Sequence, residues 1–190
     1  MRILHLVTFF VPSLGYTEYY LAKKQLKLGF NVKVVCSRYQ IRSRVLMPSG
    51  LMLEDGIPVI RLKIAYVFRG NVLFFNPFEL ANIIKDFSPD IVHCRGLLSP
   101  LAQEALLLKR SHRYKVVGDL ITGISPLTSI FLPKLNFISS LWFSKKVDAF
   151  FACNKAVEKF LIKALGVSPS KVHFIPLGAD VELFKSDQSQ

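Results

Sequence analysis

The chain has 190 residues, of which 51% are hydrophobic and 20% are charged, a balance that suits one α/β domain and excludes a disordered protein. Lys and Arg outnumber Asp and Glu by 25 to 13, which gives a net charge of +12 and favours anionic partners. The basic residues form no dense runs, so we expect no binding of nucleic acid.

The first half of the chain alternates short β-rich runs with helical periods. Its predicted strands span 2–8, 31–36 and 57–63, and its predicted helices span 18–28 and 77–87. Gly29 follows the first helix at the usual position of a terminator, and Pro77 suits the first turn of the second. The stretch 38–55 is predicted as a long loop or an irregular hairpin.

The second half continues the same alternation. Its predicted strands span 90–94, 115–120, 147–152 and 171–175, and its predicted helices span 99–109, 125–144 with a break near Pro133, and 154–165 with Asn154 as the N-cap. Short apolar strands that alternate with longer helices indicate a Rossmann-like, doubly wound and mainly parallel sheet of about seven strands. We assign residues 1–176 to this domain and 177–190 to a connector or tail.

Ligands of doubly wound sheets bind beyond the carboxyl ends of the strands, where the strand order reverses. In the common order, the strands 2–8 and 90–94 are neighbours at this point. The sequence therefore predicts that the segments 10–18 and 93–98 meet in a crevice.

The first crevice segment contains Gly15, Tyr16 and Glu18. Gly15 allows a tight turn, and the amides that open the next helix can cradle an anion. The segment has neither a dinucleotide fingerprint nor a Walker loop, so an ordinary strand-to-helix turn is the alternative. Glu18 is either a ligand or a favourable charge in the first helical turn.

The second crevice segment contributes His93 and Arg95. His93 can act as an acid, a base or a hydrogen-bond donor, and Arg95 can hold a phosphate or a carboxylate. The alternative is a core histidine and a solvated arginine. Asp119 and Thr122 border the same edge, where Asp119 either accepts a hydrogen bond from a sugar hydroxyl or caps the next helix.

The remaining histidine of the first strand, the acidic residues and the cysteines give no further sign of a site. His5 lies inside the first strand, and no acidic set has the spacing of a metal site. The cysteines are Cys36, Cys94 and Cys153, an odd number without CxxC spacing, which argues against disulfides and zinc and indicates a reducing cytoplasm. Only Cys94 falls in the predicted crevice, and burial is its simpler interpretation.

Taken together, these segments resemble the amino-terminal domain of the family 4 retaining glycosyltransferases, which have the GT-B fold. The resemblance rests on 2–6 with Pro12 and 15–18, on 88–93, and most specifically on 175–180 with Phe184. It covers nearly the whole chain.

The resemblance implies transfer of a sugar from a nucleotide sugar to a glycan, a lipid-linked acceptor or a small alcohol, with no cofactor beyond that donor. This domain would form the acceptor side, and a second domain, which we expect outside this chain, would bind the donor. We therefore expect the chain alone to be inactive. The substrate-binding candidates are Gly15, Tyr16, Glu18, His93, Arg95 and Thr122.

The catalytic residues stay open, with His93 and Asp119 as candidates. The histidine that the family often has past the fifth strand has no counterpart in 118–122, and Arg95 stands where many members have a second histidine. An arginine there suggests a phosphorylated acceptor.

Two alternatives accompany this interpretation. The apolar stretch 131–143, with Lys134, Lys145 and Lys146 nearby, suits an interfacial helix on an anionic membrane, which would make the cytoplasmic protein peripheral to the inner face. A buried helix or a domain interface explains it equally well. The alternative function is a non-catalytic binding subunit that pairs with a separate donor-binding chain.

Overall fold

The computed structural model describes residues 1–40, 45–68, 72–97, 99–119 and 145–178. Its main sheet has eight strands in the order β10-β9-β8-β7-β1-β2-β4-β3. The strands are β1 (Arg2–Leu6), β2 (Asn31–Ser37), β3 (Gly50–Glu54), β4 (Ile57–Leu62), β7 (Ile91–Arg95), β8 (Lys115–Asp119), β9 (Ala149–Ala152) and β10 (Val172–Phe174). Among these described strands, β3 pairs antiparallel with β4, and every other pairing in this sheet is parallel.

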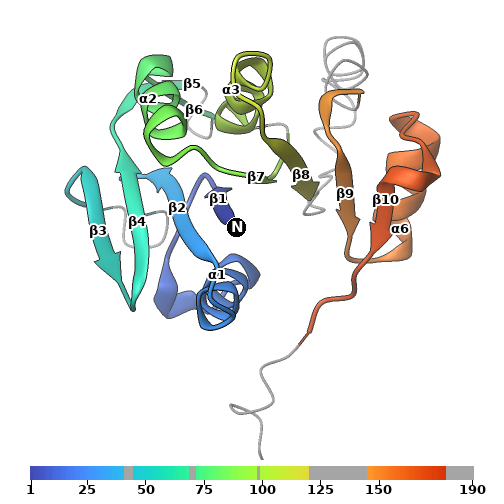
Figure 1. The fold of residues 1–190 in the computed structure, drawn as a ribbon, viewed down its shortest axis with the longest axis horizontal. Helices are drawn as coiled ribbons and strands as arrows, with labels where there is room; N and C mark the ends of the chain where they lie inside the picture. Colours follow the sequence, from blue (N-terminus) through green and yellow to red (C-terminus); the bar gives the residue numbers. More distant parts are fainter. Residues whose placement is uncertain (41–44, 69–71, 98, 120–144, 179–190) are drawn as a thin grey trace, which may run out of the picture.

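Helices cover both faces of the sheet, as the sequence predicts for a doubly wound fold (Figure 1). The helix α1 (Thr17–Lys27) lies on one face, and α2 (Pro77–Phe87) and α3 (Pro100–Leu108) lie on the other. A short helix, α6 (Lys155–Lys159), continues as a π-helical turn (Phe160–Ala164) beside β9 and β10. Asn154 caps α6, because its Oδ1 accepts a hydrogen bond from the Val157 amide at 2.9 Å, as predicted.

The core follows from the alternation of side chains along each strand. One set of buried side chains packs against α2 and α3 and includes Leu4, Leu6, Val92 and Val116. The alternate residues of the same segment, such as Ile3 and Val7, belong to a second buried set on the face of α1. At Gly118 of β8, an added Cβ would lie 2.5 Å from the Leu97 side chain, so this close approach requires glycine.

Two features differ from the sequence-based expectation. The stretch 38–55 contains an antiparallel bridge between Tyr39 and Leu46, in line with the predicted irregular hairpin, but it ends in the edge strand β3, which was not predicted. A two-stranded hairpin of β5 (Ile64–Phe68) and β6 (Val72–Phe75) also precedes α2. The solvent-facing positions of β3 are leucines, Leu51 at 64% and Leu53 at 72% exposure. The strand therefore lacks the alternation of apolar and polar residues that would predict it. The predicted helix 125–144 and the tail 179–190 lie outside the described residues.

A buried arginine fixes the start of the loop that follows β1. Arg61 of β4 is fully buried and contacts Glu54 through Nε and Nη2, each at 2.7 Å from a carboxylate oxygen. It also donates to the carbonyl oxygens of Phe10 at 3.0 Å and Ser37 at 3.1 Å. These contacts join β2, β3 and β4 to the segment that leads into α1.

Candidate functional site

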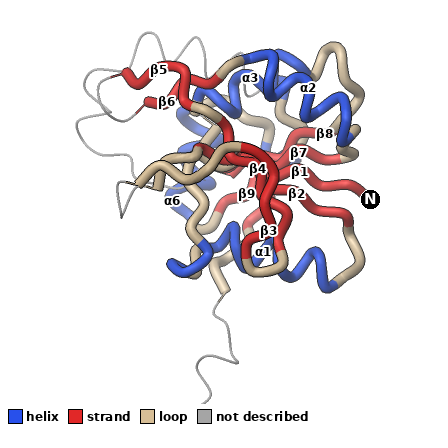
Figure 2. The backbone as a smooth tube through the Cα atoms, turned by 90° about the vertical axis from the view of Figure 1, so that its left-hand side faces the viewer, coloured by secondary structure: helices blue, strands red, loops and turns tan. Residues whose placement is uncertain are grey.

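The strands β1 and β7 lie side by side, as the predicted strand order requires (Figure 2). In their register His5 is opposite His93, and Arg95 is opposite Asp119 in the next strand, β8. Because alternate residues of a strand face the same side, His93 and Arg95 share the face that α1 covers. The two predicted crevice segments therefore meet at the carboxyl end of the sheet.

Four side chains form a compact polar group here, which we call the carboxyl-edge cluster: Glu18, His93, Arg95 and Asp119. Arg95 lies between the two acids, with Nε 2.9 Å from Glu18 Oε2 and Nη1 3.2 Å from Asp119 Oδ2. Glu18 is nearly buried and its Oε2 forms no hydrogen bond within the described residues, so its contact with Arg95 is electrostatic. The alternative of a solvated arginine is therefore wrong.

A tight turn after β7 holds Asp119 in place. Gly96 adopts a φ of 73°, in the left-handed region, and its amide donates to Asp119 Oδ1 at 3.2 Å. The other carboxylate oxygen of Asp119 faces Arg95 and lies 3.7 Å from His93 Nε2. Within the described residues, Asp119 therefore acts at the strand end as a charged partner of β7.

Burial dominates the electrostatics of the cluster. It raises the pKa of Glu18, and the opposing effect of Arg95 does not cancel it. It raises the pKa of Asp119 in the same way, again against Arg95. Since a single described cation, Arg95, faces one buried and one partly buried carboxylate, the cluster holds a proton more readily than solvated acids do. Such perturbed groups at a strand end are typical of functional sites.

His93 is neutral at physiological pH. Burial, and next the charge of Arg95, lowers its pKa to about 4. The Nε2 atom of His93 is buried and has no hydrogen-bond partner within the described residues, whereas Nδ1 lies 3.0 Å from Nδ1 of His5. His93 is thus available as a neutral hydrogen-bonding group rather than as a cation.

A cavity of about 420 Å³ extends from this cluster along the sheet. His93, Arg95 and Asp119 lie in its wall, and Thr17 and Gln25 of α1 face them. Along the strands the lining is apolar and includes Ile3, Ile91, Val117 and Phe151. The segment 175–178 closes another side. A small polar end on a mainly apolar cavity is the usual form of a site for a small molecule.

The structure brings together only part of the predicted set. Glu18, His93, Arg95 and Asp119 meet, and the last three line the cavity, whereas Glu18, Gly15 and Tyr16 do not. Gly15, at a φ of 58°, ends a 3-10 turn, and the half-exposed Tyr16 stands at the N-cap of α1. Their role as phosphate-binding amides stays a prediction. Thr122 lies outside the described residues.

Sequence reasoning missed several residues of the cavity wall. Gln25, Phe151 and Cys153 line it, and His5 lies directly behind His93. Cys94, the cysteine expected near the crevice, is fully buried in the core on the other face, as its simpler interpretation predicted. The alternation within β7 separates Cys94 from His93 and Arg95, so strand periodicity could have shown this.

Two other features are not found in the part of the chain that the structure describes. Within these ranges, no three or more His, Cys, Asp or Glu side chains lie together as metal ligands would. None of the helices in the same ranges is long and apolar enough to cross a bilayer.

Solved structures of other proteins share this architecture. Sucrose-phosphate synthase from Thermosynechococcus elongatus matches 96% of the chain with a TM-score of 0.70 and 12% identity, over 49% of its own length. Anabaena Alr3699/HepE, solved with UDP, matches 100% of the chain with a TM-score of 0.66 and 19% identity, over 47% of its length. These likenesses establish the Rossmann-like fold of one half of a GT-B protein.

The sequence places the chain more narrowly. It matches the Glycosyltransferase Family 4 model over residues 16–183 and therefore belongs to this family. One of its relatives, a subunit of the phosphatidylinositol N-acetylglucosaminyltransferase of Arabidopsis thaliana, is 29% identical over 97% of the chain. The chain spans 41% of that relative, and about half of each of the two solved proteins.

Proposed function

We propose that the full-length protein transfers a sugar from a nucleotide sugar to a hydroxyl group of an acceptor, and that this chain forms the acceptor side. The carboxyl-edge cluster carries the proposal, because it places in the cavity wall the partly buried carboxylate of Asp119 and a ring nitrogen of His93 that has no hydrogen-bond partner within the described residues. Carboxylates and a bare ring nitrogen accept hydrogen bonds, and the hydroxyls of a sugar or polyol supply donors. Membership of Glycosyltransferase Family 4 supports the reaction type.

The cluster favours a hydroxyl over a phosphate at this position. Arg95 already faces Glu18 and Asp119, so its guanidinium is compensated by more negative charge than it carries. A phosphate would have to displace one of these carboxylates, against the electrostatics of the site. The phosphorylated acceptor suggested by Arg95 in the sequence is therefore less favoured than a neutral polyol.

The apolar part of the cavity favours an acceptor with an apolar portion. Ile91, Val117 and Phe151 line the wall beyond the polar cluster. The Arabidopsis relative is named for transfer to phosphatidylinositol, a lipid that joins a polyol to apolar tails. We extend the proposal to a lipid-linked polyol acceptor. Peripheral contact with an anionic membrane and a cytoplasmic location stay predictions.

Transfer assays on the full-length protein test the reaction. With labelled nucleotide sugars and either free inositol or an inositol lipid, we expect the lipid to be the better acceptor. Replacing Asp119 with Asn should lower kcat/KM for the acceptor by about 10- to 100-fold, the effect of losing one charge-assisted hydrogen bond. Lys115→Gln is the matched control, because Lys115 begins the strand that Asp119 ends.

The outcomes separate the alternatives. Absence of transfer to any alcohol would overturn the proposal, and an unchanged Asp119→Asn variant would overturn the role of the cluster. Activity that appears only when a separate donor-binding chain is added would favour a non-catalytic binding role for this chain. Calorimetry on this chain alone should show at most millimolar affinity for uridine or guanosine diphosphate, whereas micromolar affinity would place the donor site here.

A further inference from the structure

A line of buried polar contacts leads from α1 to the cavity. Gln25 Oε1 on α1 lies 2.6 Å from Nε2 of His5, and Nδ1 of His5 lies 3.0 Å from Nδ1 of His93. The two rings meet nearly at right angles, with an interplanar angle of 84°. His5 has no exposed surface, although a buried polar ring costs free energy unless it is hydrogen-bonded at both nitrogens.

The contacts define where each proton lies. Burial, and next the neighbouring His93, lowers the pKa of His5 to about 3, so each ring carries one proton at neutral pH. A carbonyl oxygen only accepts hydrogen bonds, so the proton of His5 is on Nε2, where it faces Gln25. The Nδ1 atom of His5 is then a lone pair, and the contact between the rings requires the proton of His93 on its own Nδ1.

The far side of His93 agrees with this assignment. With Nδ1 protonated, Nε2 carries a lone pair, and this buried atom has no hydrogen-bond partner within the described residues. The nearest acid, Asp119 Oδ2, is 3.7 Å away, too far to accept a hydrogen bond. A proton on Nε2 would therefore have no hydrogen-bond acceptor, whereas a lone pair there can accept a hydrogen bond from a bound ligand.

We propose that His5, held by Gln25, is a positioning residue that fixes His93 in the tautomer with a bare Nε2, so that His93 accepts a hydrogen bond from the acceptor hydroxyl. This inference rests on the proposed transfer to a hydroxyl. His93 is too weak a base to take the proton, so its role is to orient the oxygen that attacks the sugar. Asp119, on the other side of the gap, can receive a second hydroxyl of the same polyol.

Nuclear magnetic resonance of the 15N-labelled chain tests the assignment without an activity assay. The ring nitrogens of His93 should report a protonated Nδ1 and a bare Nε2 at pH 7. In His5→Phe the hydrogen-bond acceptor for Nδ1 of His93 is lost, and the ring proton of His93 should move toward its Nε2. Gln25→Leu should change the same signals, while Lys24→Leu, at the exposed neighbouring position of α1, should leave them unchanged. A protonated Nε2 in the unmodified chain would overturn the inference.

Kinetics of the full-length protein separate positioning from mere packing. His5→Phe should lower kcat by about 10- to 100-fold, the usual effect of losing an orienting partner, without changing KM for the donor. His5→Asn offers a side-chain oxygen to Nδ1 of His93 and should recover most of the loss. Equal losses in both variants, or full activity of His5→Phe, would overturn the positioning role. If no variant transfers sugar, the proposed function fails while the tautomer measurement stands.

Discussion

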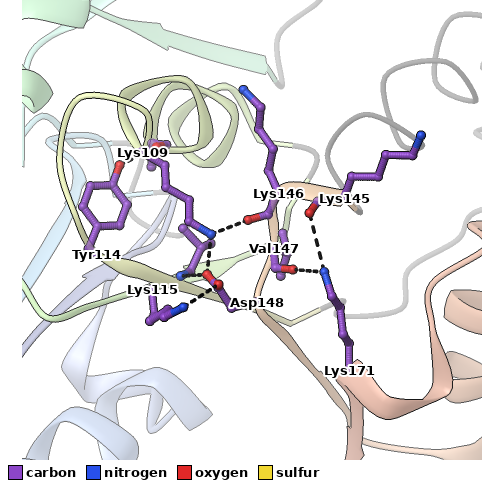
Figure 3. A network of polar contacts seen from close by, with 10 residues as sticks. Lys109, Tyr114, Lys115, Lys145, Lys146, Val147, Asp148 and Lys171 are labelled. Atoms are coloured by element: carbon purple, nitrogen blue, oxygen red, sulfur yellow. Dashed lines mark hydrogen bonds and ion pairs between the residues drawn. The ribbon is translucent and has the colours of Figure 1, made fainter.

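The two ends of strand β8 carry opposite kinds of polar cluster. The strand begins at Lys115 and ends at Asp119. At its end lies the carboxyl-edge cluster, with one cation between the buried Glu18 and the partly buried Asp119. At its start lies a basic group that we call the amino-edge cluster, made of Lys109, Lys115, Asp148 and Lys171. Lys109 and Lys115 pair with Asp148, and Lys171 donates to backbone carbonyl oxygens (Figure 3).

Within the described residues, every member of the amino-edge cluster has a partner in the chain itself. The Lys109 ammonium contacts Asp148 and donates to the Lys146 carbonyl at 2.6 Å, and Lys171 donates to the Val147 carbonyl at 2.9 Å (Figure 3). Asp148 also accepts from the Val116 amide at 2.7 Å. Burial raises the pKa of Asp148, but these contacts outweigh it and hold that pKa below 3.8.

The contrast indicates that the amino-edge cluster stabilises the fold, whereas the carboxyl-edge cluster keeps groups free for the proposed acceptor. Among the described residues, the amino-edge groups have partners and tie the start of β9 to α3 and to the turn before β10. The carboxyl-edge cluster keeps raised acid pKa values and leaves Glu18 Oε2 and His93 Nε2 without a hydrogen bond. Incomplete satisfaction of buried polar groups is destabilising, and proteins retain it at functional sites.

The largest effect should come from removing the central cation of the carboxyl-edge cluster. Arg95→Met leaves Glu18 and Asp119 buried without a compensating charge, which should lower the free energy of unfolding by about 3–5 kcal/mol at pH 7. Urea denaturation measures this loss. Because the two carboxyls can take up protons, the loss should shrink as the pH falls toward 5.

The matched control for Arg95→Met is Lys115→Met at the other edge. The side chain of Lys115 is 75% exposed, so its contact with Asp148 at 3.4 Å should contribute less than about 0.5 kcal/mol. Equal losses in the two variants would show that the two clusters do not differ in this way.

An intermediate effect should follow from the histidine pair. The pKa values of His5 and His93 are lowered to about 3 and about 4, while both rings titrate near 6.5 in the unfolded chain. Below pH 6.5 the unfolded state therefore binds more protons, and stability falls with the pH until the folded rings titrate. Each histidine should contribute a loss of up to about 1.4 kcal/mol per pH unit in this window.

Denaturation at pH 7.0 and 5.5 measures this loss. The raised pKa values of Glu18 and Asp119 act in the opposite sense, since protonation of these acids stabilises the folded state as the pH falls. The double variant His5→Asn/His93→Asn keeps both acids and removes the two rings, so its stability should fall less on acidification. An equal fall in both proteins would contradict neutral buried histidines.

The parts of this site that depend only on the order of the strands could be predicted from the sequence. Alternating apolar runs and the crevice rule predicted the contact between the segments of Glu18 and Arg95, and a strand end located Asp119. The contact between His5 and His93 depends on the register of two strands 88 residues apart, which no local pattern specifies. The hairpin β5–β6 escaped prediction because its strands are short and mainly apolar.

Apart from the Lys115→Met control, the smallest effect should come from Asp148→Ala in the amino-edge cluster. The variant leaves the Val116 amide without its carboxylate acceptor and frees Lys109, which should cost about 1–2 kcal/mol at pH 7. Because the folded pKa of Asp148 is depressed, this contribution is fully present above 3.8 and is lost as the pH falls further, so the variant and the unmodified protein should converge in acid. Acceptor binding, measured on the full-length protein, should be unchanged because the opposite end of the strand holds the cavity. A loss of acceptor binding without a loss of stability would reverse the roles assigned to the two edges.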